Sequence, residues 1–123
     1  MKLHTDPQDV QRISAYDRHS VMVSGTRLAS PFLITADRLL PDLDVPPTAA
    51  LRWSDLEPLI GDELQILLLG TGARQQFPDS ALYAEMATRG IGLEVMDSAA
   101  ACRTFNILVA EGRRVAALIV VGD

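Results

Sequence analysis

LQILLLGTG, at residues 64–72, decides the fold class of this chain. The stretch is apolar except for one glutamine up to Leu69, and it then stops at the turn Gly70-Thr71-Gly72. Such a run predicts a strand covered on both faces, which is typical of a parallel or mixed sheet with helices packed on it. Loops at the carboxyl ends of these strands are where open α/β sheets hold ligands or partners. The turn is therefore the first candidate for a functional surface.

Short β patterns precede this strand. We expect strands at 13–16, 21–23 and 31–35, and then a rigid surface connection at 41–47, where two adjacent prolines cannot continue a helix or a central strand. These patterns predict that the chain begins with a β-rich region.

A short helical pattern surrounds Trp53, the only tryptophan. Ser54 is suited to be an N-cap, and Glu57 follows three residues later. Pro58 conflicts with a regular helix, so we expect a short turn or a 3₁₀ piece. We interpret Trp53 as a core anchor rather than as a binding platform.

Strand and helix patterns alternate after the glycine turn. They predict a helix at 80–89, a strand at 91–96, a helix at 98–110 and a strand at 113–121. An Asp-Ser pair stands before each helix, and a glycine follows it, as suits capping at both ends. The last strand is apolar on both faces, so we expect it to be central. The order of the elements predicts an α/β domain with a mixed sheet.

Length and composition limit the function classes. The 123 residues fit a single domain, 1–123, in which residues 1–11 form a loosely ordered leader. A net charge of −5 argues against binding the phosphate backbone of nucleic acid. A single cysteine favours a reducing compartment, and no apolar run resembles a signal peptide or approaches the ~20 residues that span a bilayer. We therefore expect a cytoplasmic protein without direct membrane insertion.

Three interpretations compete for the glycine turn. The P-loop requires Lys followed by Ser or Thr, and the dinucleotide fingerprint requires a third glycine where Gln75 stands. A nucleotide phosphate site is therefore the least favoured. A tight turn whose glycines permit positive φ is favoured, ahead of a partner or ligand surface. Arg74 is the nearest charge that could meet a carboxylate or phosphate, although a solvated loop arginine is the simpler interpretation.

Polar residues also gather at the predicted helix 98–110. Asp97 is interpreted chiefly as its N-cap, and Arg103 stands in the same group. Asn106 follows Cys102 by four residues and shares its helix face. Its side chain either binds the backbone of a neighbouring loop or lines a pocket, and the sequence does not favour one over the other.

Cys102 lies near the positive end of the same predicted helix, which can lower the pKa of a thiol. A catalytic thiol also needs a base, and neither of the histidines, His4 and His19, is placed beside it by the sequence. A small buried thiol is therefore the favoured interpretation. One cysteine and two scattered histidines give no zinc pattern.

Three motifs in a fixed order carry a family resemblance. They are a strand ending in G-T-G at 67–72, the strand-to-helix junction GIGLEVMDSAAA at 90–101, and RTFN at 103–106. The Trp53 segment and RRVAA at 113–117 support them. From about residue 13 to residue 121 the chain resembles a small family of α/β proteins that includes the mitochondrial complex I assembly factor three and an adipogenesis-associated protein.

This resemblance implies a three-layer α/β fold. Its central mixed sheet has about five strands, an N-terminal β-hairpin region precedes it, and the last strand runs antiparallel to its neighbours. It implies no established enzymatic activity, and neither it nor the residues predict a catalytic residue, a metal site or a cofactor. The mitochondrial relative assists assembly of the membrane-bound NADH:ubiquinone oxidoreductase, and the lack of a mitochondrial leader here fits a bacterial form.

Two hypotheses follow. The first is a non-enzymatic assembly module that binds a protein partner through the segments 70–76 and 97–106, as a monomer or weak homodimer associated peripherally with an inner-membrane complex. The second is a small-molecule-binding protein or an enzyme that uses a cleft beside the glycine turn. In that case Arg74, Arg103 and Asn106 are the expected anchors, with Cys102 as a further candidate.

Overall fold

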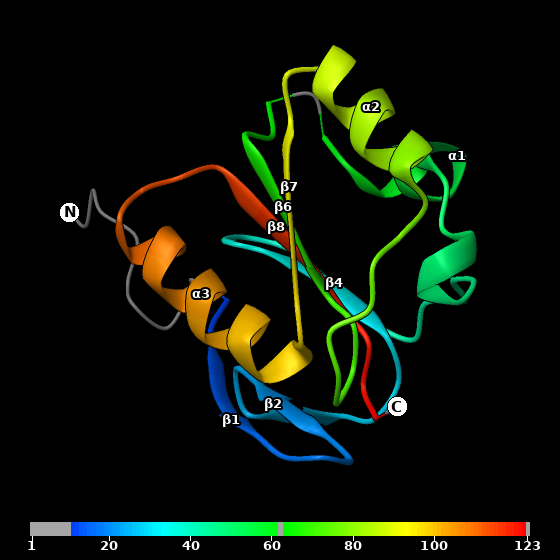
Figure 1. Cartoon of the computed structure of the whole chain (residues 1–123). Helices are drawn as coiled ribbons and strands as arrows, with labels where there is room; N and C mark the ends of the chain where they lie inside the picture. The colour runs from blue at the N-terminus through cyan, green and yellow to red at the C-terminus, as the bar shows by residue number, and fades with distance from the viewer. Residues whose placement is uncertain (1–10, 62, 123) are drawn as a thin grey trace, which may run out of the picture.

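A computed structural model of the protein describes residues 11–61 and 63–122. It contains a three-stranded sheet in the order β1-β2-β3 and a five-stranded sheet in the order β5-β4-β8-β6-β7 (Figure 1). The strands are β1 (Ile13–Tyr16), β2 (Val21–Val23), β3 (Thr26–Leu28), β4 (Phe32–Thr35), β5 (Leu39–Leu40), β6 (Ile66–Gly70), β7 (Gly92–Met96) and β8 (Val115–Ile119). The helices are η2 (Thr48–Ala50), α1 (Trp53–Leu56), η3 (Glu57–Leu59), α2 (Ser80–Thr88) and α3 (Ser98–Ala110).

The leader expected at residues 1–11 lies outside the described residues except for Gln11. The Gln11 N–H donates to the carbonyl of Ala36 at 2.8 Å, so this residue is already part of the fold.

β8 lies in the middle of the five-stranded sheet. It pairs antiparallel with β4, where Leu118 faces Leu33, and parallel with β6, where Leu118 faces Leu69. The predicted central position is confirmed, but the expectation that β8 runs antiparallel to its neighbours is wrong for β6. The physical reason is the connection through α3, since a helical crossover returns the chain to the same end of the sheet and makes β8 parallel to β7 and β6.

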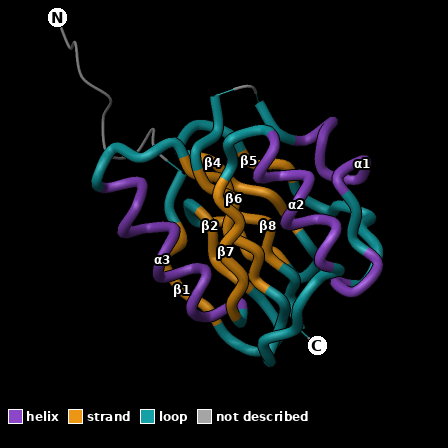
Figure 2. Tube along the Cα trace, turned by 45° about the horizontal axis from the view of Figure 1, so that its top comes forward, coloured by secondary structure: helices purple, strands orange, loops and turns teal. Residues whose placement is uncertain are grey.

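Both faces of this sheet are covered, which gives the three layers that were predicted. Leu68 of β6 belongs to the apolar cluster beneath α3 and the three-stranded sheet. Leu67 and Leu69 point to the opposite face and join the cluster beneath α1 and α2. Figure 2 shows α3 and α2 on opposite sides of the strands. Because side chains alternate along β6, this one strand contributes residues to both apolar clusters.

The two long helices begin and end where their capping residues predict. The Asp79 carboxylate accepts the Ala81 N–H at 2.9 Å at the start of α2. Gly90 and Gly112, which follow α2 and α3, have φ of 73° and 78°. A left-handed residue just past a helix end is the usual role of glycine.

The first helix differs from the prediction. α1 begins at Trp53, and the preceding Arg52 donates its N–H to the Asp55 carboxylate at 2.9 Å. Ser54, predicted as the N-cap, therefore lies inside the helix. The 3₁₀ piece expected at Pro58 is confirmed as η3.

The strands show smaller differences. The predicted strands at 64–69, 91–96 and 113–121 are present as β6, β7 and β8 with slightly different bounds. The strands β3 and β5 were not predicted. Both are very short, and Thr26 and Arg27 of β3 are exposed, so neither carries a clear apolar period.

Candidate functional site

The glycine turn at the end of β6 presses against the first turns of α3. A Cβ on Gly70 would lie 3.0 Å from the Ala101 Cβ, the Ser98 Cα and the Ile119 Cδ1. Close packing therefore requires glycine at this position. Gly72 needs glycine for a different reason, because its φ is 97°.

Ser98 fastens this turn to α3 and to the end of β8. Its hydroxyl accepts the Gly72 N–H at 2.8 Å and donates to the Val120 carbonyl at 2.6 Å. Its own N–H donates to the Gly72 carbonyl at 2.9 Å. The Ser98 side chain is only 2% exposed, so these bonds are shielded from water.

The backbone amides on either side of Gly72 also donate hydrogen bonds within the protein. The Thr71 N–H donates to the Met96 carbonyl and the Ala73 N–H to the Gly122 carbonyl, both at 3.0 Å. Because the Gly72 N–H is bound to Ser98, the backbone N–H groups of Thr71, Gly72 and Ala73 all have acceptors within the protein. This arrangement favours the interpretation as a structural turn over that as an anion cradle.

The loop after the turn is held in place by side chains. The Thr71 hydroxyl donates to the Arg74 carbonyl at 2.6 Å and accepts the Gln76 N–H at 3.0 Å. The Gln75 side-chain amide donates to the Val95 carbonyl at 3.0 Å. The loop therefore has a defined conformation beside β7.

Phe77 ends this loop with its side chain 62% exposed, while the following Pro78 is buried. Sequence reasoning missed this residue, because it belongs to no strand or helix pattern. The available signal was an aromatic residue that stands between a glycine turn and a helix cap without a core position to fill. An exposed aromatic on an ordered loop is a natural contact residue.

A second exposed aromatic, Tyr16, lies where β1 meets α3, and it was also missed. Burial raises the pKa of the Tyr16 hydroxyl, the Asp97 carboxylate adds to this rise, and Arg103 opposes it. Tyr16 ends β1, the strand that Asn106 joins to α3, and α3 carries Asp97 at its N-cap and Arg103 in its first half. Asp97 itself is the N-cap of α3, since its carboxylate accepts the Ala100 N–H at 2.9 Å, as predicted.

Asn106 and Cys102 face inward. The Asn106 carboxamide donates to the Ile13 carbonyl at 2.6 Å and accepts the Ile13 N–H at 3.2 Å. It therefore binds a neighbouring backbone, one of its two predicted alternatives, and that backbone is a strand rather than a loop. Cys102 is 3% exposed, and burial raises the pKa of its thiol to about 12. This confirms the prediction of a buried thiol.

The structure thus divides the predicted residues into three places. Gly70, Thr71, Gly72 and the backbone of Arg74 form the anchored turn and loop. Asp97 and Arg103 lie on the outer part of α3 near Tyr16. Asn106 joins α3 to β1 and is not on the same surface. We call the loop at 70–77 together with Asp97, Arg103 and Tyr16 the turn surface.

Two pockets lie away from the turn surface. One, of about 400 Å³, lies between η2, α1 and α2, and the other, of about 560 Å³, lies near the start of β8. Neither is lined by the glycine turn, Arg74, Asp97, Arg103 or Asn106. The cleft predicted beside the turn therefore corresponds to neither pocket.

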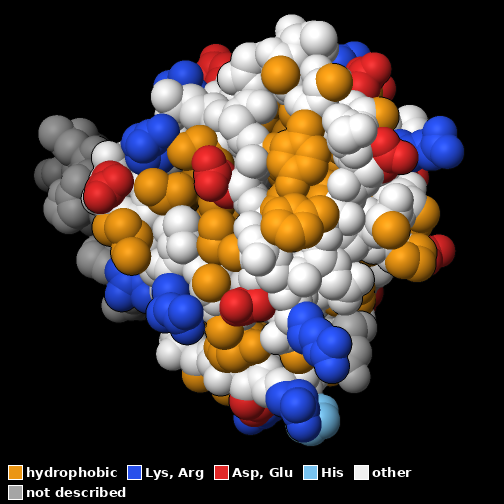
Figure 3. All heavy atoms as spheres, viewed as in Figure 1, with side chains coloured by type: hydrophobic (Ala, Val, Ile, Leu, Met, Phe, Trp, Pro, Cys, Tyr) orange, Lys and Arg blue, Asp and Glu red, His pale blue; other side chains and the backbone are white. Residues whose placement is uncertain are grey.

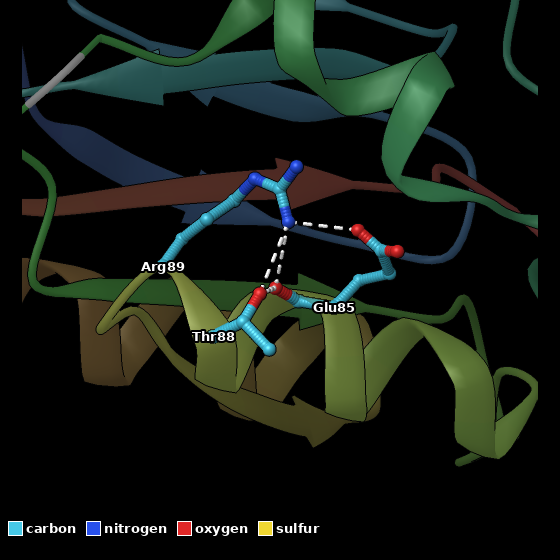
Figure 4. A network of polar contacts seen from close by, with 3 residues as sticks. All are labelled: Glu85, Thr88 and Arg89. Carbon is cyan, nitrogen blue, oxygen red and sulfur yellow. Dashed lines mark hydrogen bonds and ion pairs between the residues drawn. The ribbon is translucent and has the colours of Figure 1, made fainter.

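The smaller pocket is bordered by Trp53 and, on α2, by Ala81, Leu82 and Glu85. The Arg89 guanidinium lies 4.4 Å from the centroid of the Trp53 ring. The same guanidinium bonds to the Glu85 carboxylate at 2.7 Å and to the Thr88 hydroxyl at 3.2 Å (Figure 4). The Trp53 indole N–H is buried and has no hydrogen-bond partner among the residues that the structure describes. Trp53 also packs against the apolar cluster beneath α2, as a core anchor does.

Residues 11–61 and 63–122 contain neither a candidate metal site nor a candidate membrane-spanning helix. In these segments no three His, Cys, Asp or Glu side chains are grouped so that they could hold a metal ion. No helix in the same segments is long and apolar enough to cross a membrane.

Comparison with known proteins identifies relatives over nearly the whole chain. The NADH dehydrogenase [ubiquinone] 1 alpha subcomplex assembly factor 3 of Xenopus tropicalis is 33% identical over 132 residues, which cover 94% of this chain and 72% of that protein. A 13 kDa major membrane protein of Francisella tularensis is 30% identical over 91 residues, 73% of this chain and 74% of that protein. The NMR structure of a Xanthomonas campestris protein superposes with a TM-score of 0.85 at 38% identity, covering 99% of this chain and 93% of that one.

A protein family described as "Protein of unknown function (DUF498/DUF598)" matches residues 13–120. This match spans every strand and helix described above, and it agrees with the resemblance carried by the sequence motifs. The chain therefore belongs to the DUF498/DUF598 family.

Proposed function

We propose that this chain is a single-domain protein-binding module that acts in the assembly of a membrane-bound respiratory complex and catalyses no reaction itself. One observation carries the proposal, namely the 62% exposed side chain of Phe77 on a loop that hydrogen bonds hold in place. An aromatic side chain on an ordered loop loses little conformational entropy on binding, and such residues dominate the affinity of protein interfaces. The similarity to an NADH dehydrogenase assembly factor supports the choice of a respiratory complex.

The binding site that we propose is the turn surface. It combines the apolar rings of Phe77 and Tyr16 with the charges of Arg74, Asp97 and Arg103, a mixture that suits a protein partner. The chain itself acts as a monomer or weak homodimer at the cytoplasmic side of an inner membrane. The similarity to a major membrane protein supports a peripheral location next to a membrane complex.

Affinity purification of the tagged protein from its own organism, followed by mass spectrometry, tests this proposal. The wild type should recover subunits of a respiratory complex or inner-membrane assembly proteins, and Phe77→Ser should lose them. Ile107→Ser is the matched control for the loss of an exposed apolar side chain, because Ile107 is 57% exposed and lies on α3, one helical turn beyond Arg103, rather than on the loop at 70–77. Recovery of the partner by Phe77→Ser at the wild-type level would show that Phe77 takes no part in binding, and loss with Phe77→Ser but not with Ile107→Ser would support the loop as the binding site.

The charged part of the surface is tested separately. Arg74→Ala and Arg103→Ala each remove an exposed guanidinium and should weaken the same recovery while the melting temperature changes little. If both variants recover the partner as well as the wild type does, the charges of the turn surface take no part in binding.

A second candidate function, binding of a small molecule, is favoured by the pocket of about 400 Å³. It has a partly apolar wall at Trp53, both signs of charge from Arg52, Asp79 and Glu85, and a volume in the range of ligand sites. A thermal-shift screen of metabolites tests it. A true ligand should raise the melting temperature of the wild type but not of Ala81→Leu, whose larger side chain occupies the pocket. A screen in which no metabolite has this effect refutes the candidate.

A further inference from the structure

β7 is an edge strand whose outer side has no partner strand among the described residues. The Gly92 N–H and the Met96 carbonyl bond toward the β6 side, at 2.9 and 3.0 Å. Because backbone groups alternate in direction along a strand, the N–H and C=O groups of Leu93 and Val95 point away from β6. β7 therefore presents a short row of donors and acceptors along its free side.

This row is open to contact. The opposite edge of the sheet is β5, which consists of two residues, whereas β7 has five. The Val95 carbonyl accepts a hydrogen bond from the Gln75 side chain at 3.0 Å, so an added strand has to displace this side-chain donor with a backbone donor of its own. Hydrophobic side chains gather in the middle of Figure 3, over the region where Figure 1 draws β7 and α2.

Gly92 gives a second, independent indication. Its φ is not positive, it is exposed, and a Cβ placed on it would meet only the Gln65 carbonyl at an ordinary 3.6 Å. Neither the backbone conformation nor internal packing requires glycine here, in contrast to Gly70. Glycine inside a strand lowers stability by roughly 0.5–1 kcal/mol. A glycine that the fold does not need is typical of a place where another backbone approaches closely.

We propose that the free edge of β7 binds an extended segment of the partner protein as an added antiparallel strand, with a Lys or Arg of that segment opposite Glu94. Glu94 is exposed in the middle of β7, and opposite charges facing each other across a strand pair are stabilising. The inference rests on the proposed function, because it specifies the kind of segment that the partner supplies.

Charge also argues against a second copy of this chain as the occupant. If two β7 strands pair antiparallel over their full length, residue 92 faces residue 96 and Glu94 faces Glu94. Like charges directly opposite each other destabilise such a pair. A basic partner segment has no such penalty.

Two synthetic peptides provide the test. Both alternate threonine with valine, and one has lysine at its centre where the other has glutamate. Binding to the full chain is followed by NMR, together with hydrogen exchange of the Leu93 and Val95 amides. The lysine peptide should bind roughly two- to thirtyfold more tightly than the glutamate peptide and should slow the exchange of both amides.

Two variants sharpen the test. Glu94→Lys should reverse the order of the two peptides. Gly92→Val should weaken the lysine peptide without lowering the stability of the fold, since its side chain has room inside the chain. A lysine peptide that is N-methylated at its hydrogen-bonding positions should lose binding, because only the backbone donors are changed.

Four results with the peptides overturn the inference. Equal binding of the two peptides, no binding of either at millimolar concentration, or protection at amides outside β7 would each exclude a basic strand at this edge. Protection of Leu93 and Val95 that rises with protein concentration alone would identify a second copy as the occupant instead.

If the peptides fail while Phe77→Ser still abolishes partner recovery, the proposed function stands without this edge. If they bind while recovery is unaffected by Phe77→Ser, the edge stands and the turn surface does not.

Discussion

Gly70→Ala tests the close contact between β6 and α3 most directly. The new methyl group would lie 3.0 Å from three carbon atoms, whereas carbon atoms in contact normally lie about 3.5–4.0 Å apart. The end of the Ile119 side chain can rotate away. The Ala101 Cβ and the Ser98 Cα are fixed on α3, so the helix itself has to move.

The size of the destabilisation depends on the hydrogen bonds that hold α3 in place. A shift of about 0.5 Å or more in α3 stretches the bonds of Ser98 to Gly72 and Val120, which are 2.6–2.9 Å long. Overpacking of a core costs about 1–3 kcal/mol, and these tethers place Gly70→Ala near 2 kcal/mol. Gly92→Ala is the matched control in the neighbouring strand, and it should raise the free energy of unfolding by about 0.5 kcal/mol.

Urea denaturation of the wild type and both alanine variants measures these differences. The midpoint of Gly70→Ala should fall while that of Gly92→Ala stays constant or rises. Equal midpoints for the two variants would refute the reasoning, because the chemical change is the same and only the surroundings of the added methyl group differ.

Three further predictions concern other residues. Ser98→Ala leaves the buried Gly72 N–H without an acceptor and should lower the free energy of unfolding by about 1–3 kcal/mol in the same urea assay, with an unchanged value as the contrary result. Asn106→Asp loses the donor to the Ile13 carbonyl, and should therefore speed hydrogen exchange in β1 and β2 more than in β6. Burial raises the pKa of Cys102 from 9.0 to about 12, so the thiol stays protonated in the folded protein while it ionises in the unfolded chain above about pH 9. The free energy of unfolding should therefore decrease between about pH 9 and about pH 12, by up to about 4 kcal/mol, and Cys102→Ala should remove this part of the decrease.

Local signals predicted the two long helices and the buried strands. Asp79 and Asp97 cap their helices through contacts within a few residues, and Gly90 and Gly112 end them through a local dihedral angle. Helix caps and C-terminal glycines depend only on residues close together in the chain, so they can be predicted from the sequence. The N-cap of α1 was misplaced because the Asp55 carboxylate binds the N–H of Arg52, and Ser54 had offered a competing local pattern.

Long-range features were harder to predict. The direction of β8 relative to β6 depends on where the crossover through α3 returns, which no single residue encodes. The glycine turn was recognised as a candidate surface, but its amides are bound to residues such as Met96 and Gly122 that are distant in the sequence. The exposure of Phe77 likewise depends on which side chains pack around it in the folded protein. The glycine turn, Arg74, Asp97 and Arg103 were therefore predictable as candidates, while Phe77, Tyr16 and the orientation of all these residues required the fold.

The central position of β8 has a consequence for the order in which the protein is made. β4 and β6 do not touch each other as partners, because β8 lies between them and pairs with both. While the ribosome is still synthesising residues 115–119, the edges of β4 and β6 that pair with β8 are unpaired, and the apolar side chains that β8 covers are exposed. Folding of the five-stranded sheet must therefore follow translation of β8, and until then these edges are sites where a chaperone binds or where chains aggregate.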